Sequence, residues 1–163
     1  MKAFLLSIVL TISVFFGCKS PQPSHQTVNT LIDNWHKAAT NADEEVFFGS
    51  MTEDAIYLGT DASERWLRDE LKAWSAKYFD RESAWDFTPR DRNIYFSNDG
   101  KLVWFEELLD TWMGTCRGSG VLYLTKNGWK IAHYHLSVTI DNDLIQNFIS
   151  LVKKEPNEME LNN

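Results

Sequence analysis

The clearest strand pattern in the chain is Gly128-Trp129-Lys130-Ile131-Ala132-His133-Tyr134-His135-Leu136-Ser137. Side chains alternate between the two faces of a strand, so His133 and His135 are expected to share a face with Trp129. The preceding Asn127-Gly128 pair is typical of the tight turn that closes a hairpin. The stretch therefore predicts the last strand of an antiparallel sheet, with both imidazoles on its concave side.

Working backwards from this stretch, the second half of the chain reads as a meander of strands. Apolar, β-branched and aromatic residues predict strands over 85–89, 94–97, 102–111, 117–126 and 129–139. Asn98-Asp99-Gly100 supplies a second hairpin turn. The strand at 117–126 is apolar on both parities, which indicates that its outer face is covered too. A second copy of the chain packed on the sheet would cover it, and so would a tail.

The first half of the chain has helical periodicity instead. Apolar residues recur at helical spacing over 27–42, 43–51 and 61–79, with a short strand at 55–58. Asp61 and Glu64 fit a capping box at the start of the third helix. A last apolar stripe, over 144–152, predicts a short C-terminal helix. Helices followed by an antiparallel meander define an α+β domain with the helices on one face of the sheet.

The N-terminus has the pattern of an export signal. Lys2 precedes an apolar run over residues 3–16, which is shorter than the roughly 20 residues that a membrane-spanning helix needs. The segment Val14-Phe15-Phe16-Gly17-Cys18 resembles a bacterial lipobox. The resemblance implies that residues 1–17 are a signal peptide and that Cys18 is lipidated. The alternatives are ordinary secretion and a short uncleaved anchor.

This pattern also divides the chain. We expect a signal peptide at 1–17, a linker at 18–26 that includes lipidated Cys18, one domain at 27–153 and a disordered tail at 154–163. The net charge of −7 and the lack of a basic run argue against nucleic acid and against electrostatic membrane binding. The resemblance to a lipobox implies a location in the cell envelope, lipid-anchored and facing the periplasm. With Cys18 acylated, Cys116 has no disulfide partner and is expected to be a buried apolar residue.

Five segments resemble the SnoaL-like branch of the nuclear transport factor 2-like superfamily. They are Trp35-His36, the segment Gly59 to Trp66, the strand Val103 to Glu107, the segment Cys116 to Val121, and the final strand from Gly128 to Ser137. The resemblance implies three N-terminal helices packed in a curved antiparallel sheet, a cone-shaped, cystatin-like α+β barrel with a conical pocket. That fold hosts isomerases, cyclases, dehydratases and non-catalytic modules, so function has to be argued from the pocket.

Three groups of polar residues are candidates for chemistry in such a pocket. They are Asp61, Glu64 and Arg65 before the third helix, Glu106 or Glu107 with Arg117 in the sheet, and His133 with His135. Each group also has a structural interpretation: helix capping, an architectural buried ion pair, and hydrogen-bonding imidazoles. Two histidines are a weak zinc signal, and no nucleophile elbow, P-loop or dinucleotide motif occurs, so no metal or cofactor is expected.

The leading hypothesis is a domain that binds a small, partly apolar molecule in an aromatic pocket. The expected ligand-binding residues are Trp35, Tyr57, Glu64, Arg65, Trp66, Trp104 and Arg117. The rival is an acid–base enzyme of the isomerase, cyclase or dehydratase type, with Asp61, Glu106, His133 and His135 as candidate catalytic residues. The third hypothesis is a non-catalytic homodimer, paired through the sheet, whose pocket is filled by its own Trp and Phe side chains.

Overall fold

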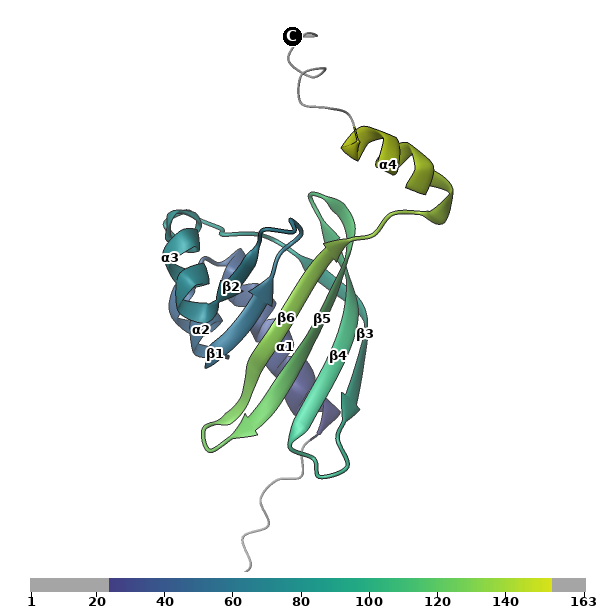
Figure 1. The fold of residues 1–163 in the computed structure, drawn as a ribbon. Coiled ribbons are helices and arrows are strands. Elements are labelled where there is room, and N and C mark those ends of the chain that lie inside the picture. The colour runs from purple at the N-terminus through teal and green to yellow at the C-terminus, as the bar shows by residue number, and fades with distance from the viewer. Residues whose placement is uncertain (1–23, 154–163) are drawn as a thin grey trace, which may run out of the picture.

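The computed structural model describes residues 24–153, which form an α+β domain with its helices against one curved sheet (Figure 1). In chain order the elements are α1 (His25–Thr40), α2 (Glu44–Gly49), β1 (Met51–Leu58), β2 (Arg65–Leu67), α3 (Arg68–Phe79), β3 (Thr88–Phe96), β4 (Leu102–Thr111), β5 (Gly114–Thr125), β6 (Gly128–Val138), the 3-10 turn η1 (Asn142–Leu144) and α4 (Ile145–Val152). The predicted fold class is confirmed. The predicted signal peptide, Cys18 and the tail at 154–163 lie outside the described residues.

The sheet has six strands in the order β2-β1-β6-β5-β4-β3. The meander from β3 to β6 is antiparallel, as expected, and Gly100 and Gly128 adopt the left-handed backbone conformation that their hairpin turns need. However, β1 pairs parallel with β6, so the sheet is mixed rather than wholly antiparallel. A parallel pair needs a long crossover, and here α3 and the whole meander supply it.

Several element boundaries differ from the sequence-based prediction, two of them in ways that matter for the sheet. The third helix begins at Arg68 rather than near residue 61, because residues 65–67 form β2 and pair with β1, placing Trp66 opposite Tyr57. The predicted strands at 85–89 and 94–97 merge into β3. The register of β3 against β4 shifts within this strand, which explains why its apolar pattern looked interrupted.

Large aromatic side chains fill the space between α1 and the sheet. Trp35 of α1, which is only 1% exposed, stacks on Phe47 of α2 at 4.8 Å between ring centroids. It also meets Tyr134 of β6 edge-on at 4.7 Å. Phe105 of β4 also packs near Tyr134, at 6.2 Å between ring centroids, and Cys116 is buried as predicted. Rings of this size dominate a core's apolar burial, so the deep part of the cone is a packed interior.

A bulge in β6 decides which of its residues face this interior. Leu122 lies opposite Ile131 while Val121 lies opposite His133, so Ala132 is an extra residue in β6. A bulge of one residue moves the side chains that follow it to the opposite face. The alternation predicted from the sequence therefore breaks in the middle of the strand.

The helix α4 stands apart from the domain. It extends from the end of β6 and packs against η1, and none of its residues is buried (Figure 1). Its apolar side chains are exposed, including Phe148 and Leu151. Across residues 24–153, no helix is both long enough and apolar enough to cross a membrane.

Candidate functional site

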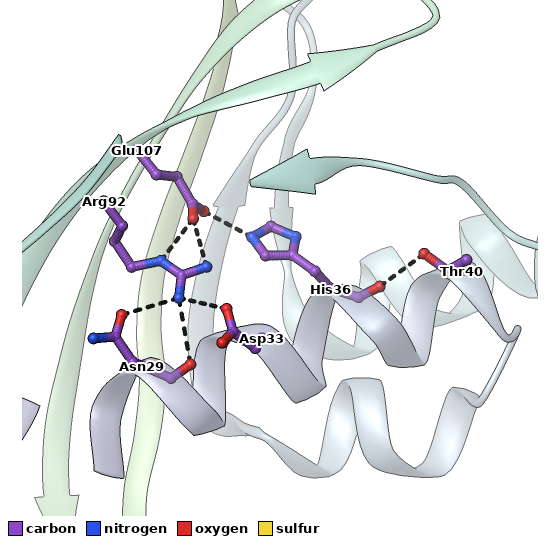
Figure 2. Close-up of polar contacts among 6 residues, drawn as sticks. All are labelled: Asn29, Asp33, His36, Thr40, Arg92 and Glu107. Carbon is purple, nitrogen blue, oxygen red and sulfur yellow. Dashed lines mark hydrogen bonds and ion pairs between the residues drawn. The ribbon is translucent and has the colours of Figure 1, made fainter. Parts of the chain in front are cut away.

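A closed ionic cluster lies between α1 and the sheet (Figure 2). The two carboxylate oxygens of Glu107 on β4 have different partners. Oε1 lies 2.7 Å from Nε2 of His36 on α1, and Oε2 lies 2.8 Å from both Nε and Nη2 of Arg92 on β3. The Nη1 group of Arg92 donates to the backbone and side-chain oxygens of Asn29 and, at 2.6 Å, to Asp33. Every charge in the cluster therefore has an opposite charge or a hydrogen bond.

The charge of Glu107 is stabilised although the residue is fully buried. Burial acts to raise the pKa of the carboxyl group, but the hydrogen bond and charge of His36 and the charge of Arg92 outweigh it. The pKa of Glu107 consequently lies below its ordinary value. A carboxylate that is ionised and fully paired is suited to holding α1 against the sheet rather than to exchanging a proton near neutral pH.

The hydroxyl group of Tyr134 lies beside this cluster, buried and without a hydrogen-bond partner among the described residues. It sits over Gly118 of β5, where any side chain would collide with it and would crowd Glu107. Burial, and after it the charge of Glu107, raises the pKa of Tyr134 well above its ordinary value. The phenol therefore stays neutral, and its place in the core depends on the glycine.

The sequence missed most of this cluster. Strand alternation correctly implies that one of Glu106 and Glu107 points inward, but the inward residue is Glu107, and Glu106, the predicted catalytic candidate, lies on the outer face. Its arginine partner is Arg92, not Arg117, which is exposed on the outer face. His36 was noted only for the resemblance of its helix. No local pattern links Arg92 to Glu107, because the contact depends on how β3 pairs with β4.

The other predicted sheet residues lie on the outer face. Glu106 accepts a hydrogen bond from the Tyr95 hydroxyl, at 3.3 Å, and Trp104 is 44% exposed and stacks on Tyr95. His133 is half-buried and His135 is exposed, both after the β6 bulge. The expectation that the two imidazoles share the concave side with Trp129 is thus wrong, and Tyr134 and Leu136 take the inward positions.

An open pocket of about 280 Å³ lies at the end of the sheet where β4 turns into β5. Its walls come from the β1–β2 turn, α3, the segment before β3, the β4–β5 turn and β6. The lining residues are Gly59, Thr60, Glu64, Trp74, Tyr78, Ala84, Trp85, Phe87, Trp112, Met113 and Leu136. Five of them are aromatic, and Glu64 is the one charged residue in the set.

The turn between β1 and β2 positions Glu64 in this pocket. Asp61 accepts hydrogen bonds from the backbone N–H and the hydroxyl of Ser63, which lower its pKa, and the Glu64 carboxylate accepts one from the Asp61 N–H at 3.2 Å. The predicted capping box is therefore present in part: Glu64 reaches back to the Asp61 N–H, but the Asp61 carboxylate binds Ser63 instead of the Glu64 N–H, and the motif closes a turn rather than a helix. A side chain at Gly59 would collide with the Glu64 carboxylate. Glycine at this position leaves room for the carboxylate beside the pocket.

Four further predicted ligand-binding residues do not line the pocket, and one of them packs against a residue that does. Trp66 stacks on Trp74, which lines the pocket, at 5.3 Å between ring centroids. Trp35 and Tyr57 belong to the packed core, and burial, followed by the charge of Glu64, raises the pKa of Tyr57. Arg65 is exposed and is not among the lining residues. Within residues 24–153, no group of three or more His, Cys, Asp or Glu side chains is placed to hold a metal ion.

Comparison with known proteins identifies the family. The family model of the SnoaL-like domain matches residues 28–141, so the chain belongs to this family. No match was found among curated proteins. The sequence-based assignment to the SnoaL-like family is confirmed.

Solved structures agree with this assignment. A domain of unknown function with a cystatin-like fold from Nostoc punctiforme has a TM-score of 0.69 at 12% identity, over 87% of this chain and 93% of that one. A nuclear transport factor 2-like protein from Cytophaga hutchinsonii has a TM-score of 0.59 at 16% identity, over 71% and 98%. A nuclear transport factor 2-like protein of unknown function from Pseudomonas putida has a TM-score of 0.60 at 14% identity, over 72% of this chain and 88% of that one. Similarity at these identities concerns the fold alone.

Proposed function

We propose that this SnoaL-like domain binds a small, partly apolar molecule in the pocket beside the β4–β5 turn. The observation that supports the proposal is the composition of the pocket: five aromatic rings with a single charged group, Glu64. Ligand sites are typically concave, mostly apolar and equipped with few polar groups. A volume of about 280 Å³ sits just below the roughly 300–1,000 Å³ usual for such sites, which favours a small ligand.

The geometry favours binding over acid–base catalysis. A catalytic carboxylate is expected to have a pKa raised towards neutrality beside open volume. The inward Glu107 has a lowered pKa and is fully paired, and His133 and His135 lie on the outer face. The groups that an isomerase or dehydratase would use are therefore not gathered at the pocket.

The test is to fill the pocket and follow a neutral aromatic probe. Indole binding to the domain would be measured by ligand-observed NMR and by shifts of the tryptophan N–H signals. Ala84→Phe, which places a ring inside the lining, should abolish binding, and Thr60→Phe should weaken it. Ala73→Phe, on the exposed side of α3, is the matched control and should bind like the wild type. Equal binding by the Ala84 and Ala73 variants would refute the proposal.

We also propose that the domain works outside the cytoplasm as a lipid-anchored envelope protein. The support is the apolar run that ends at Gly17-Cys18. Metabolic labelling with an alkyne-tagged fatty acid should mark the wild type and Cys116→Ala but not Cys18→Ala. Mass spectrometry of small molecules released from protein purified from its native membrane would then identify the ligand. Labelling that survives in Cys18→Ala would overturn the anchor.

The outer face of the sheet supports a further proposal, that the domain is a homodimer. Tyr95, Trp104 and Tyr123 each expose between 43% and 47% of their surface there. Exposed aromatic patches on a sheet are typical of interaction surfaces. Trp104→Glu should shift sedimentation equilibrium towards the monomer, whereas Trp112→Glu, at the β4–β5 turn, should not. A wild-type domain that sediments as a monomer at high concentration would exclude this arrangement.

A further inference from the structure

The charge of Glu64 is the unusual feature of the pocket. Its side chain is half-buried, and it forms no ion pair with any group in residues 24–153. Its one recorded hydrogen bond, from the Asp61 N–H to Oε2, leaves Oε1 without a donor among these residues. The pocket therefore contains an uncompensated negative charge, in contrast to Glu107, whose two oxygens are both paired.

The aromatic rings of the lining also favour a positively charged ligand. The faces of aromatic rings attract cations through their quadrupole, and Trp85, Phe87 and Trp112 surround the volume beside Glu64. Two rings of the lining already contact cations of the chain: Lys77 Nζ lies 5.0 Å from the Tyr78 ring centroid and 5.8 Å from that of Trp74, and Arg81 Cζ lies 4.8 Å from that of Tyr78. Neither basic residue lines the pocket, so the inner surface combines aromatic rings with one free carboxylate.

We infer that the pocket selects a small organic cation of the alkylated ammonium class, an inference that rests on the proposed function. An anion would be repelled by Glu64, and a neutral molecule would leave the carboxylate beside it without a counter-charge, so it should bind more weakly than a cation. A primary ammonium group needs several hydrogen-bond acceptors, and besides Glu64 the lining side chains offer only the hydroxyl groups of Thr60 and Tyr78, while most of the walls are Trp, Phe, Met and Leu. An alkylated ammonium group presents methyl groups to the rings while its charge faces Glu64.

The experiment compares two probes of the same shape. Choline and 3,3-dimethylbutan-1-ol differ in a charged nitrogen against a neutral carbon, and titration calorimetry of the protein would give both affinities. Choline should bind about tenfold more tightly than the alcohol. Glu64→Gln should weaken choline about tenfold and leave the alcohol within about twofold. Glu45→Gln, which removes an exposed charge away from the pocket, should change neither.

A second variant guards against a folding defect. Thr60→Lys places a cation in the lining beside Glu64 and should weaken the binding of choline much more than that of the alcohol, with an unchanged melting temperature. Equal binding of the two probes by the wild type would overturn the cation inference. If the alcohol or indole still bound and Ala84→Phe blocked that binding, the proposed function would stand without the cation inference. Binding of neither probe would also overturn the inference, and the indole experiment would separately decide the proposed function.

Discussion

The ionic cluster and the pocket each contain a glutamate that is at least half-buried, but the two carboxylates have different surroundings. In the cluster, Glu107 is fully buried and bound on both oxygens by His36 and Arg92. In the pocket, Glu64 is half-buried among aromatic rings and has no ion-pair partner within residues 24–153. A buried charge that is paired ties elements together, whereas one left unpaired beside open volume is available to a ligand. The difference separates architecture from the proposed function.

Breaking the cluster should have the largest effect on stability. Glu107→Ala leaves the buried His36 without its carboxylate partner and Arg92 with Asp33 alone, so we expect a loss of about 3–5 kcal/mol in the free energy of unfolding. Urea denaturation followed by circular dichroism measures it. Glu106→Ala, one residue away but on the outer face, is the control and should change stability by less than about 0.5 kcal/mol. Similar losses for the two variants would contradict the distinction between the faces.

The glycine under Tyr134 gives the next largest effect. Gly118→Ala brings a methyl group against the Tyr134 hydroxyl and should cost about 1–3 kcal/mol of unfolding free energy. Tyr134→Phe removes that hydroxyl and should recover part of the loss in the double variant. The coupling is read from a double-mutant cycle of urea midpoints. Additive losses would show that the crowding lies elsewhere.

The cluster should also make stability depend on acid. Because the pKa of Glu107 is lowered on folding, the unfolded chain binds this proton more readily than the folded one. The contribution of Glu107 is therefore complete above its unfolded pKa of about 4.5 and disappears as the pH falls through the lower folded pKa. Thermal melts between pH 6 and pH 2 should show a steeper loss for the wild type than for Glu107→Gln. If the melting temperatures of the two proteins fell in parallel with pH, Glu107 would not contribute to the loss of stability in acid.

A substitution in the pocket should have the opposite effect from one in the cluster, because it should weaken ligand binding and leave stability unchanged. Trp112 is 83% exposed, so Trp112→Ala should leave the unfolding free energy within about 0.5 kcal/mol. It should nevertheless weaken indole or choline binding about threefold to tenfold, because one wall of the pocket is removed. Calorimetric titration beside a urea curve checks both parts. A loss of stability without a loss of affinity would show that Trp112 contributes to folding and not to ligand binding.

The smallest effect is expected from α4, which belongs to neither region. Its residues are not buried, so a domain ending at Ile140 should melt within about 2 °C of the longer chain. Differential scanning calorimetry measures the difference. A clear loss of stability would mean that α4 has a partner, and sedimentation of both forms would show whether that partner is a second copy.

Most elements of the fold were predictable because their signals are local. Helical spacing in α1, the Asn127-Gly128 turn and the alternation of β4 each depend on neighbouring residues only. Glu64 was identified from its spacing to Asp61, although the motif closes a turn in place of a helix. The aromatic walls at Trp85 and Trp112 were not predicted, because segments far apart in the chain meet there.

The sequence by itself determined the family, the α+β class, the buried Cys116 and an inward carboxylate at one of two positions. Tertiary structure decided that the position is Glu107, that its partners are His36 and Arg92, and that His133 and His135 face outward. The physical reason is register. A single extra residue in β6 reverses every side chain beyond it, and the pairing of β3 with β4 sets which arginine reaches the carboxylate. Such choices depend on contacts between strands, which no local pattern along the chain contains.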